Sequence, residues 1–461
     1  MMLSFIPFAL TFAVVYSATW ACIFTPTVDV LDGAYRHQAD TYRAVQLLTQ
    51  SGFPRDHILF MNPDSVLFDE DNPTYGYLFT EPGCDARDVT YRIYPNYTEP
   101  YVNVTNFKSI LGFRHPENNT MITYDFAPND TLIYYIVGHG STGTIFCKDE
   151  YIFYDDIINA MDKFLLTHNY LHIYYFVDTC KAGSLFNHTS FSEYVHLQRF
   201  NSTYSHDINV MTATDDTHNS YPMNCNGDVL KIFYLNNFCI TDEFSKHWMD
   251  AIQFGNENTT MFDLYNYTQA HTVQSPVTTY GRWEDSAWNR PVWDAFNITG
   301  YVENMDDSAF IYSLCGLTQT DSRRLKSISA DKKAKNKKRF DVLNKYMKTH
   351  PEFLDNFEDE LTLLKNYELR SKALSGKDKT KYTLLYNEEK KRVSSIRAWE
   401  SAIRKKYPHV VFEDNGVRDW SCFRRLVNEF DAHFGHSRFG MNRFYYLSTL
   451  CDLNSTIEME W

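Results

Sequence analysis

The fold is decided by two stretches of sequence, Leu132–Val137 (LIYYIV) followed by Gly138-His139-Gly140, and Leu171–Val177 (LHIYYFV) followed by Asp178-Thr179-Cys180. Each is a short run of β-branched and aromatic residues that ends at turn or polar residues, which is typical of a buried strand. In a parallel sheet the carboxyl ends of neighbouring strands meet at one crevice, where ligands bind. The sequence therefore predicts that His139 and Cys180 converge there.

Strand and helix signals alternate over residues 19–320, which predicts an α/β fold with a mostly parallel sheet flanked by helices. Two segments, Gln38–Gln50 and Asp155–His168, have apolar residues at helical spacing, and Asp155 is expected to be the N-cap of the second. The remaining expected strands are Trp20–Thr25, His57–Met61 and Ile208–Thr214.

The chain of 461 residues is long enough for two folded units. Ser322–Arg339 is rich in lysine and indicates a linker or an exposed helix start. The strand signal disappears after it, and residues 340–461 are expected to form helices. We therefore expect a domain at 19–320 and a linker with a helical domain at 321–461.

The net charge of −14 is unevenly divided between these parts. Residues 1–320 contain 15 Lys and Arg against 37 Asp and Glu, a net charge of −22, and residues 321–461 contain 29 against 21, a net charge of +8. The two parts should attract each other, and protonation of carboxylates should weaken that attraction. Binding of the basic part to nucleic acid or anionic lipid is the alternative, and it is less favoured for an exported chain.

The N-terminus has the pattern of a secretory signal peptide at residues 1–18, with an apolar run at Leu3–Tyr16 followed by Ser17 and Ala18. A membrane anchor is the alternative, but the run is short for a bilayer span and no other apolar run reaches about twenty residues, so no stable membrane span is expected. Glycosylation sequons, which also favour the secretory pathway, begin at Asn96, Asn103, Asn118, Asn129, Asn187, Asn201, Asn258, Asn266, Asn297 and Asn454.

A thiol and an imidazole at the ends of successive strands form a candidate nucleophile–base pair. The N–H groups of Gly140 and Cys180 could then stabilise an oxyanion. Taken alone, Cys180 would more often be a buried or disulfide-bonded cysteine, and His139 a structural histidine. The nine cysteines are an odd number, which in an oxidising compartment favours one unpaired thiol.

The chain resembles the legumain family of asparaginyl endopeptidases over nearly its whole mature length. This resemblance implies a caspase-like fold, Cys180 as nucleophile, His139 as general base, cleavage after Asn and, at acid pH, after Asp, and no cofactor or metal. The motifs that carry it are Tyr35-Arg36-His37-Gln38-Ala39-Asp40, Glu70-Asp71-Asn72-Pro73-Thr74, His139-Gly140-Ser141-Thr142-Gly143, Asp178-Thr179-Cys180 and Gly183-Ser184.

The resemblance further implies a pocket for the side chain before the cleaved bond, formed by Arg36, His37, Asp178, Ser220 and Asp242. An Asn side chain would accept a hydrogen bond from Arg36 and donate to the carboxylates, whereas an ionised Asp would be repelled until protons are supplied. An ordinary structural salt-bridge network is the alternative interpretation.

Two positions depart from the family pattern. Ala34 stands where the family has an Asn that helps to orient the catalytic histidine, and Gly138 replaces an Asp that can form a succinimide. The first raises the alternative of a catalytically weakened homologue that binds peptides, and the second puts ligation chemistry in doubt. A transamidase or peptide ligase of the same family, which captures the thioester with an amine, is a further alternative.

The resemblance also implies bridges Cys225–Cys239 and Cys422–Cys451, and leaves Cys22, Cys84, Cys147 and Cys315 unassigned. It makes residues 321–461 an inhibitory prodomain held electrostatically on the catalytic part and released by acid, with Asp321, Asp331 and Asn336 as candidate cleavage sites. The partners implied are protein and peptide substrates, the chain's own prodomain and cystatin-like inhibitors, with a lysosomal, endosomal, vacuolar or secreted location.

Overall fold

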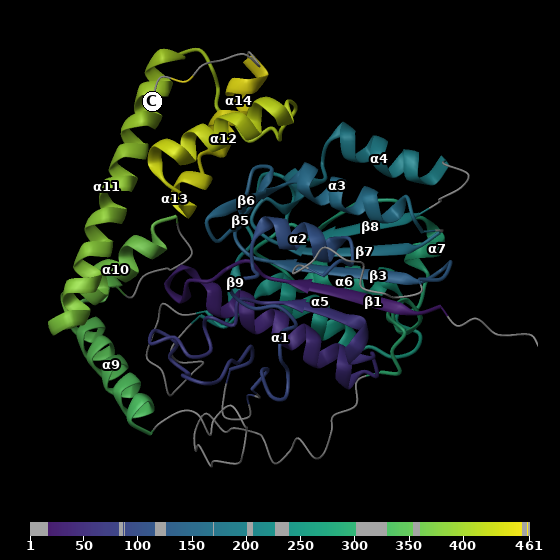
Figure 1. The fold of residues 1–461 in the computed structure, drawn as a ribbon, viewed down its shortest axis with the longest axis horizontal. Coiled ribbons are helices and arrows are strands. Elements are labelled where there is room, and N and C mark those ends of the chain that lie inside the picture. The colour runs from purple at the N-terminus through teal and green to yellow at the C-terminus, as the bar shows by residue number, and fades with distance from the viewer. Residues whose placement is uncertain are drawn as a thin grey trace, which may run out of the picture.

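The computed structural model describes residues 17–82, 86, 88–115, 126–168, 170–200, 206–225, 239–300, 330–353, 360–453 and 459. A six-stranded sheet with the order β11-β8-β7-β3-β1-β2 lies at the centre (Figure 1). All neighbouring strands are parallel except β11, which is antiparallel to β8. The strands are β1 (Thr19–Phe24), β2 (Ile58–Met61), β3 (Thr131–Val137), β7 (His172–Asp178), β8 (Asp207–Thr212) and β11 (Thr278–Gly281).

Helices cover both faces of this sheet, which explains why its central strands are apolar without interruption. In β3, Ile133 and Tyr135 belong to the core formed with α1, α5 and α6, and Leu132 and Tyr134 belong to the core formed with α2, α3 and α4. The helices are α1 (Ala34–Gln50), α2 (Val104–Leu111), α3 (Tyr154–Leu165), α4 (Thr189–Phe200), α5 (Glu243–Gln253) and α6 (Met261–His271). The expected layering of a mostly parallel sheet between helices is confirmed.

The helix boundaries differ from the expectation in two places. Helix α1 begins at Ala34, four residues before the expected Gln38, directly after Gly33 in the left-handed conformation at φ 85°. Asp155 is not the N-cap of α3, because the helix begins at Tyr154 and Phe153 occupies the cap position. The carboxylate of Asp156 accepts from the Phe153 N–H at 3.1 Å.

Several short strands were not expected from the sequence. A three-stranded antiparallel sheet follows β3, and a two-stranded ribbon precedes α5. Periodicity does not reveal such short strands, and glycine-containing turns separate the first two of them. They are β4 (Gly140–Ser141), β5 (Thr144–Cys147), β6 (Glu150–Phe153), β9 (Pro222–Met223) and β10 (Thr241–Asp242). Two short helices, α7 (Asp285–Trp288) and α8 (Val292–Phe296), follow β11.

The described part of the C-terminal region is helical, as expected. The long helix α11 runs along one side of the molecule, and α12 to α14 lie against the end that carries β5 and β6 (Figure 1). Tyr151 and Phe153 of β6 share one apolar core with these helices, and Leu31 shares another with α9 to α11. The helices are α9 (Ala330–Thr349), α10 (Thr362–Ala373), α11 (Gly376–Lys406), α12 (Trp420–Phe434), α13 (Arg438–Met441) and α14 (Phe444–Leu453).

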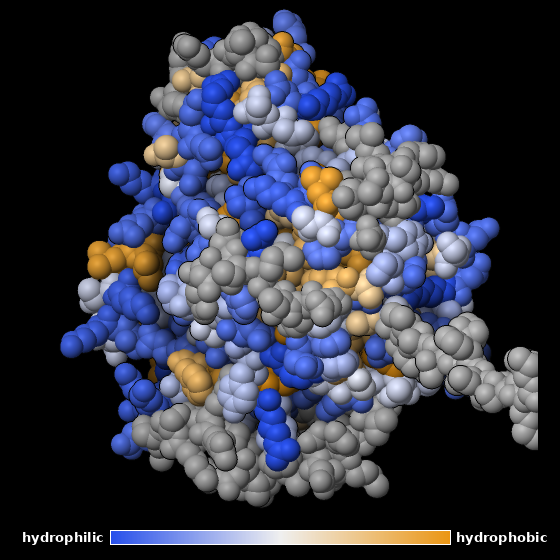
Figure 2. Space-filling model, turned by 45° about the vertical axis from the view of Figure 1, so that its right-hand side comes forward, coloured by the Kyte–Doolittle hydropathy of each residue, from blue (hydrophilic) through white to orange (hydrophobic). Residues whose placement is uncertain are grey.

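One face of the molecule carries little continuous apolar area. The face in Figure 2 is mostly hydrophilic, with separate hydrophobic patches. Within the described ranges no helix combines the length and apolarity that a bilayer span requires. Six described sequon residues, Asn96, Asn129, Asn187, Asn258, Asn266 and Asn297, are exposed, and Asn103 is half-buried. Asn118, Asn201, Asn454 and most of the expected signal peptide lie outside the described residues.

Both expected disulfides, Cys225–Cys239 and Cys422–Cys451, are present. Cys22 and Cys147 are buried thiols, and burial raises the pKa of each far above its usual value, so they are unreactive. Cys84 and Cys315 lie outside the described residues.

The Cys422–Cys451 bridge joins α12 to α14 across 29 residues. Replacing both cysteines by serine should lower the local stability of these helices by about 3–4 kcal/mol, because an open loop of this length gains entropy when it unfolds. Hydrogen exchange of the α12 and α14 amides in the full-length chain measures this change. The matched double replacement of Cys225 and Cys239 should leave exchange in α12 and α14 unaltered, and equal effects of the two pairs would contradict a local role.

Candidate active site

The ends of β3 and β7 lie in van der Waals contact. A Cβ added to Gly140 would lie 2.6 Å from Thr179 Oγ1 and 2.7 Å from the Cys180 carbonyl oxygen, so only glycine fits there. The Gly138 N–H also donates to the Asp178 carbonyl at 3.0 Å. The convergence predicted for these two strand ends is therefore present.

His139 and Cys180 line one cavity of about 460 Å³. This volume is within the range of sites that bind small ligands or a few residues of a peptide. The Sγ of Cys180 lies 3.6 Å from the carbonyl oxygen of Ser220, which also lines the cavity. The other lining residues are Gly140, Lys181, Thr217 and Asn219 from the sheet part, and Glu360, Arg438 and Asn442 from the C-terminal region.

The imidazole of His139 is held by the segment that precedes α1. Its Nε2 is hydrogen-bonded to the carbonyl oxygen of Asp32. A carbonyl only accepts, so Nε2 carries the hydrogen and Nδ1 is the nitrogen that can accept a proton. The ring of His37 stands edge-on to it, with 4.7 Å between the centroids. Burial, followed by the charges of Arg438 and Arg36, holds the pKa of His139 well below its usual value, so the imidazole is neutral.

Four of the five residues expected to form a pocket are buried, namely Arg36, His37, Asp178 and Asp242, and the fifth, Ser220, lines the cavity. Arg36 Nε donates to Asp242 Oδ1 at 2.6 Å, and His37 Nε2 lies 3.5 Å from Asp242 Oδ2. Ser220 connects this cluster to the cavity, because its hydroxyl donates to Asp178 Oδ1 at 2.7 Å. The structure thus brings the five residues together. Arg36 and His37 contact Asp242, and Ser220 contacts Asp178.

Two residues of this cluster were missed from the sequence. Asp40 accepts from the Thr241 hydroxyl at 2.6 Å and from the Asp242 N–H at 2.8 Å. Ser245 donates to Asp178 Oδ2 through its N–H at 3.0 Å and its hydroxyl at 2.5 Å. Asp40 follows Arg36 by four residues, so both lie on one face of α1, and this spacing was the available signal.

These carboxyl groups share a low-dielectric environment. Burial raises the pKa of Asp178 against the opposing hydrogen bonds from Ser245 and Ser220. Burial and the nearby charge of Asp242 raise the pKa of Asp40 well above its usual value. The cluster therefore binds protons more readily than exposed carboxylates do.

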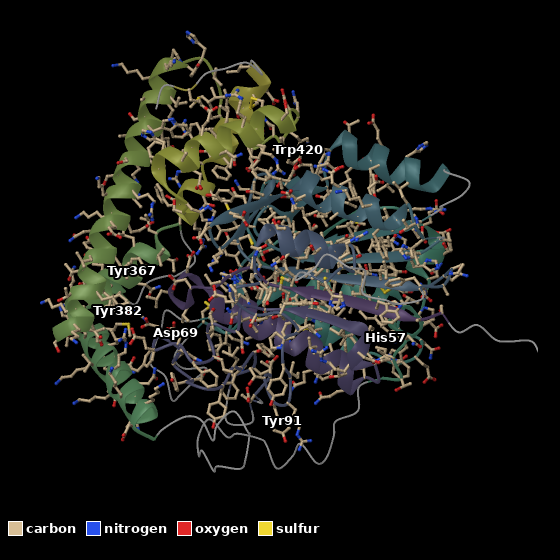
Figure 3. The ribbon with its side chains drawn as sticks, viewed as in Figure 1. His57, Asp69, Tyr91, Tyr367, Tyr382 and Trp420 are labelled. Carbon is tan, nitrogen blue, oxygen red and sulfur yellow. A yellow bond between two sulfur atoms is a disulfide. The ribbon has the colours of Figure 1, made fainter. Side chains whose placement is uncertain are left out.

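The C-terminal region reaches both loops that carry the thiol and the imidazole. Asp414 Oδ2 accepts from Thr142 Oγ1 at 2.7 Å and lies 2.5 Å from Lys181 Nζ. Trp420, labelled in Figure 3 where α12 meets the sheet part, lies over Gly143, because a Cβ added to this glycine would be 3.0 Å from its ring. Arg438 Nη1 lies 3.3 Å from Asp32 Oδ1.

A second contact surface centres on Asp71. Its carboxylate accepts from Arg370 Nε at 2.8 Å, Arg339 Nη2 at 3.2 Å and the Tyr382 hydroxyl at 2.6 Å. Burial alone would raise the pKa of Asp71, but the charges of Arg370 and Arg339 hold it below its usual value. In Figure 3, Tyr382 and Tyr367 lie on the helices that face the loop carrying Asp69.

The two departures from the family pattern have different local settings. A Cβ at Gly138 would lie 3.1 Å from Pro26 Cδ and 3.2 Å from Thr27 Oγ1, so a larger side chain would require these neighbours to move. Ala34 is fully buried at the first position of α1, and its methyl group offers no hydrogen bond to His139.

Comparisons with known proteins identify the relatives of this chain. The family model described as the Peptidase C13 family matches residues 27–292. The vacuolar-processing enzyme from Citrus sinensis is 25% identical over 446 residues, which cover 91% of this chain and 78% of that protein. Legumain from Homo sapiens is 27% identical over 256 residues, which cover 54% of this chain and 53% of that protein. The matched part thus spans about half the length of that legumain.

Among solved structures, caspase-1 from Spodoptera frugiperda aligns with 63% of this chain and 92% of its own, at 11% identity and a TM-score of 0.33. This value is too low to support an argument about the fold.

Proposed function

The chain belongs to the peptidase C13 family, and from this premise we propose that it is a cysteine endopeptidase that cleaves peptide bonds after Asn and, at acid pH, after Asp. The observation that carries the proposal is the thiol of Cys180 and the imidazole of His139 in one cavity, with a buried Arg36 and acidic side chains behind its wall. Protein and peptide chains are the substrates, reached along the secretory route to an acid compartment.

The proposed reaction begins with transfer of the Cys180 proton to Nδ1 of His139. The thiolate attacks the backbone carbonyl carbon of the substrate Asn. The N–H groups of Gly140 and Cys180 stabilise the resulting oxyanion, at about 3–4 kcal/mol for each donor. His139 then gives its proton to the departing amine, leaving a thioester. Water activated by the same imidazole hydrolyses the thioester and restores the thiol.

The proposed specificity follows from the cluster behind the cavity. An Asn side chain presents its carbonyl to the guanidinium of Arg36 and its NH2 to Asp178 and Asp242. An ionised Asp would face these carboxylates and be repelled. Because the pKa of Asp178 is raised by burial, mild acid supplies the protons that relieve this repulsion.

The full-length chain, incubated at acid pH and assayed with fluorogenic peptides, tests the nucleophile and the specificity together. Cleavage should follow Asn at about pH 5 and about pH 7, and Asp chiefly at the lower value. Cys180→Ala should abolish both activities and leave thermal unfolding unchanged. Cleavage after Lys or Leu would refute the pocket assignment, and peptide binding without cleavage would favour the catalytically weakened homologue.

Asp178→Asn separates a specificity pocket from a structural network. It keeps the shape of the side chain but removes one carboxylate, so the preference for Asn over Asp at about pH 7 should fall about tenfold. Asp250→Asn is the matched control, since Asp250 of α5 is also buried and pairs with Arg43 of α1 at 2.5 Å. If both variants lose stability and neither changes the preference, the network is only structural.

Residues 321–461 are proposed to be an inhibitory prodomain, with residues 19–320 as the peptidase domain. Three residues of the C-terminal region, Glu360, Arg438 and Asn442, line the same cavity as Cys180, and Asp414 contacts Thr142 and Lys181 of the two loops of the site. A substrate chain would have to displace them. Basic side chains of this region also pair with Asp71 and Asp156, in line with the charge division in the sequence.

The pKa shifts of Asp71 and Asp69 indicate that mild acid alone does not release the C-terminal region. Because the pKa of Asp71 is lowered, its contact keeps full strength above the usual Asp value and weakens only as the pH falls through the lowered value. The pKa of Asp69 is raised to about 6 by burial and by repulsion from Asp71, so its protonation relieves strain between carboxylates. We therefore propose that cleavage of the connecting segment completes the release.

Among the candidate cleavage sites, Asp331 in the first turn of α9 is more accessible than Asn336. The Asn336 side chain is buried and donates to the carbonyl of Glu70 at 2.8 Å. Asp321 lies outside the described residues.

Replacement of Asp71 tests the proposed inhibition. Asp71→Ala leaves Arg339 and Arg370 buried without their shared carboxylate, which should weaken docking by about 3 kcal/mol. Hydrolysis of an Asn-containing peptide by the full-length chain at about pH 7 should then rise. Glu368→Gln is the matched control, because its pairing with Lys372 lies within α10, is partly exposed and contributes little. A wild-type chain that is fully active at neutral pH with its C-terminal region uncut would contradict the inhibition.

A further inference from the structure

A carboxylate that the family resemblance does not assign, Asp32, lies beside the proposed general base. Its side chain is 7% exposed, and its carbonyl oxygen accepts from His139 Nε2. Its carboxylate oxygen Oδ1 lies 3.9 Å from the same nitrogen. One residue thus presents both a hydrogen-bond acceptor and a negative charge to the imidazole.

The backbone around Asp32 is fixed by a short turn. Residues Val30–Asp32 form a 3-10 helix whose N-cap, Asp29, accepts from the Leu31 N–H at 2.8 Å. Gly33 closes the turn in the left-handed conformation, and a Cβ there would lie 2.1 Å from Arg36 Nη1. The Asp32 carbonyl therefore points at His139 through a turn that only glycine at position 33 permits.

The need for such a residue arises from Ala34. The family resemblance expects an Asn at this position to orient the histidine, and a methyl group cannot do so. We propose, on the basis of the function proposed above, that Asp32 is the positioning residue for His139: its carbonyl holds the ring, and its carboxylate stabilises the protonated imidazole once the thiol has given up its proton.

The carboxylate of Asp32 acts on the positive charge that the imidazole gains during the reaction. When Cys180 Sγ gives its proton to Nδ1, the imidazole becomes a cation that keeps its hydrogen on Nε2, the nitrogen beside Asp32. The negative charge of Asp32 opposes the two nearby cations, Arg36 and Arg438, that disfavour this imidazolium. The charged or titratable groups that face the imidazole or line its cavity are Asp32, Arg36, His37, Cys180, Lys181, Glu360 and Arg438.

The C-terminal region forms an ion pair with this carboxylate. Arg438 Nη1 lies 3.3 Å from Asp32 Oδ1, so the charge of Asp32 is shared with a guanidinium of α13. The same Arg438 lowers the pKa of His139. Departure of α13 would remove a cation from the imidazole and leave Asp32 to act on it alone, so the pKa of His139 would rise on activation. Arg438 would thereby disable the base electrostatically as well as by occupying the cavity.

The test compares full-length wild-type, Asp32→Asn, Asp32→Glu and Asp29→Asn chains after the same acid incubation, with kcat/KM for an Asn-containing peptide measured against pH. Asp32→Asn keeps the backbone carbonyl and the shape of the side chain but removes its negative charge. Its kcat/KM should fall about tenfold, and the acidic limb of its profile, which reports protonation of the His139 base, should move about one pH unit lower. Asp32→Glu keeps the charge, so its acidic limb should stay within a fraction of a unit of the wild-type position even if its rate falls.

Asp29→Asn is the matched control in the same turn, because Asn also serves as an N-cap and Asp29 faces Tyr367 rather than His139. Both its rate and its profile should be those of the wild type. An active Asp32→Asn chain with an unmoved acidic limb would overturn the role of Asp32 and leave the proposed function intact. A wild-type chain without Cys180-dependent cleavage would overturn the proposed function and the role of Asp32 together.

Discussion

The close approach of two backbones after β3 and β7 is the constraint on which the site depends. Gly140 leaves no room for a side chain against Thr179 and Cys180, and the Gly138 N–H joins the two strand ends through the Asp178 carbonyl. The other parts of the site surround this junction. Ser220 lies over the sulfur, the turn before α1 holds the imidazole, and the buried cluster of Arg36 fills the space behind it.

The sheet and the convergence of its strand ends were predictable because apolar runs and parallel topology are local and general properties. The centres of β3 and β7 were placed within one residue for the same reason. The three-stranded sheet after β3 and the start of α1 were missed, since both depend on glycine conformations and on polar side chains buried by the site. Asp155 was misplaced as an N-cap because its neighbour Asp156 performs the capping contact one position later.

For the site, the family resemblance indicated which side chains gather but not how they pair. Arg36 and Asp242 share a direct hydrogen bond, whereas Asp178 is held by two serines, and neither arrangement follows from spacing. Asp40 and Asp32 were missed because their roles arise from contacts between segments distant in sequence. The charge division did anticipate the pairing of Arg339 and Arg370 with Asp71, but not the reversed pair of Lys181 with Asp414.

Gly33 has a consequence for how recognition and chemistry are connected. Arg36 donates to the Gly33 carbonyl at 3.3 Å, and the residue before that glycine supplies the oxygen that holds His139. A displacement of the Arg36 guanidinium would therefore be transmitted to the same peptide segment that holds the His139 imidazole.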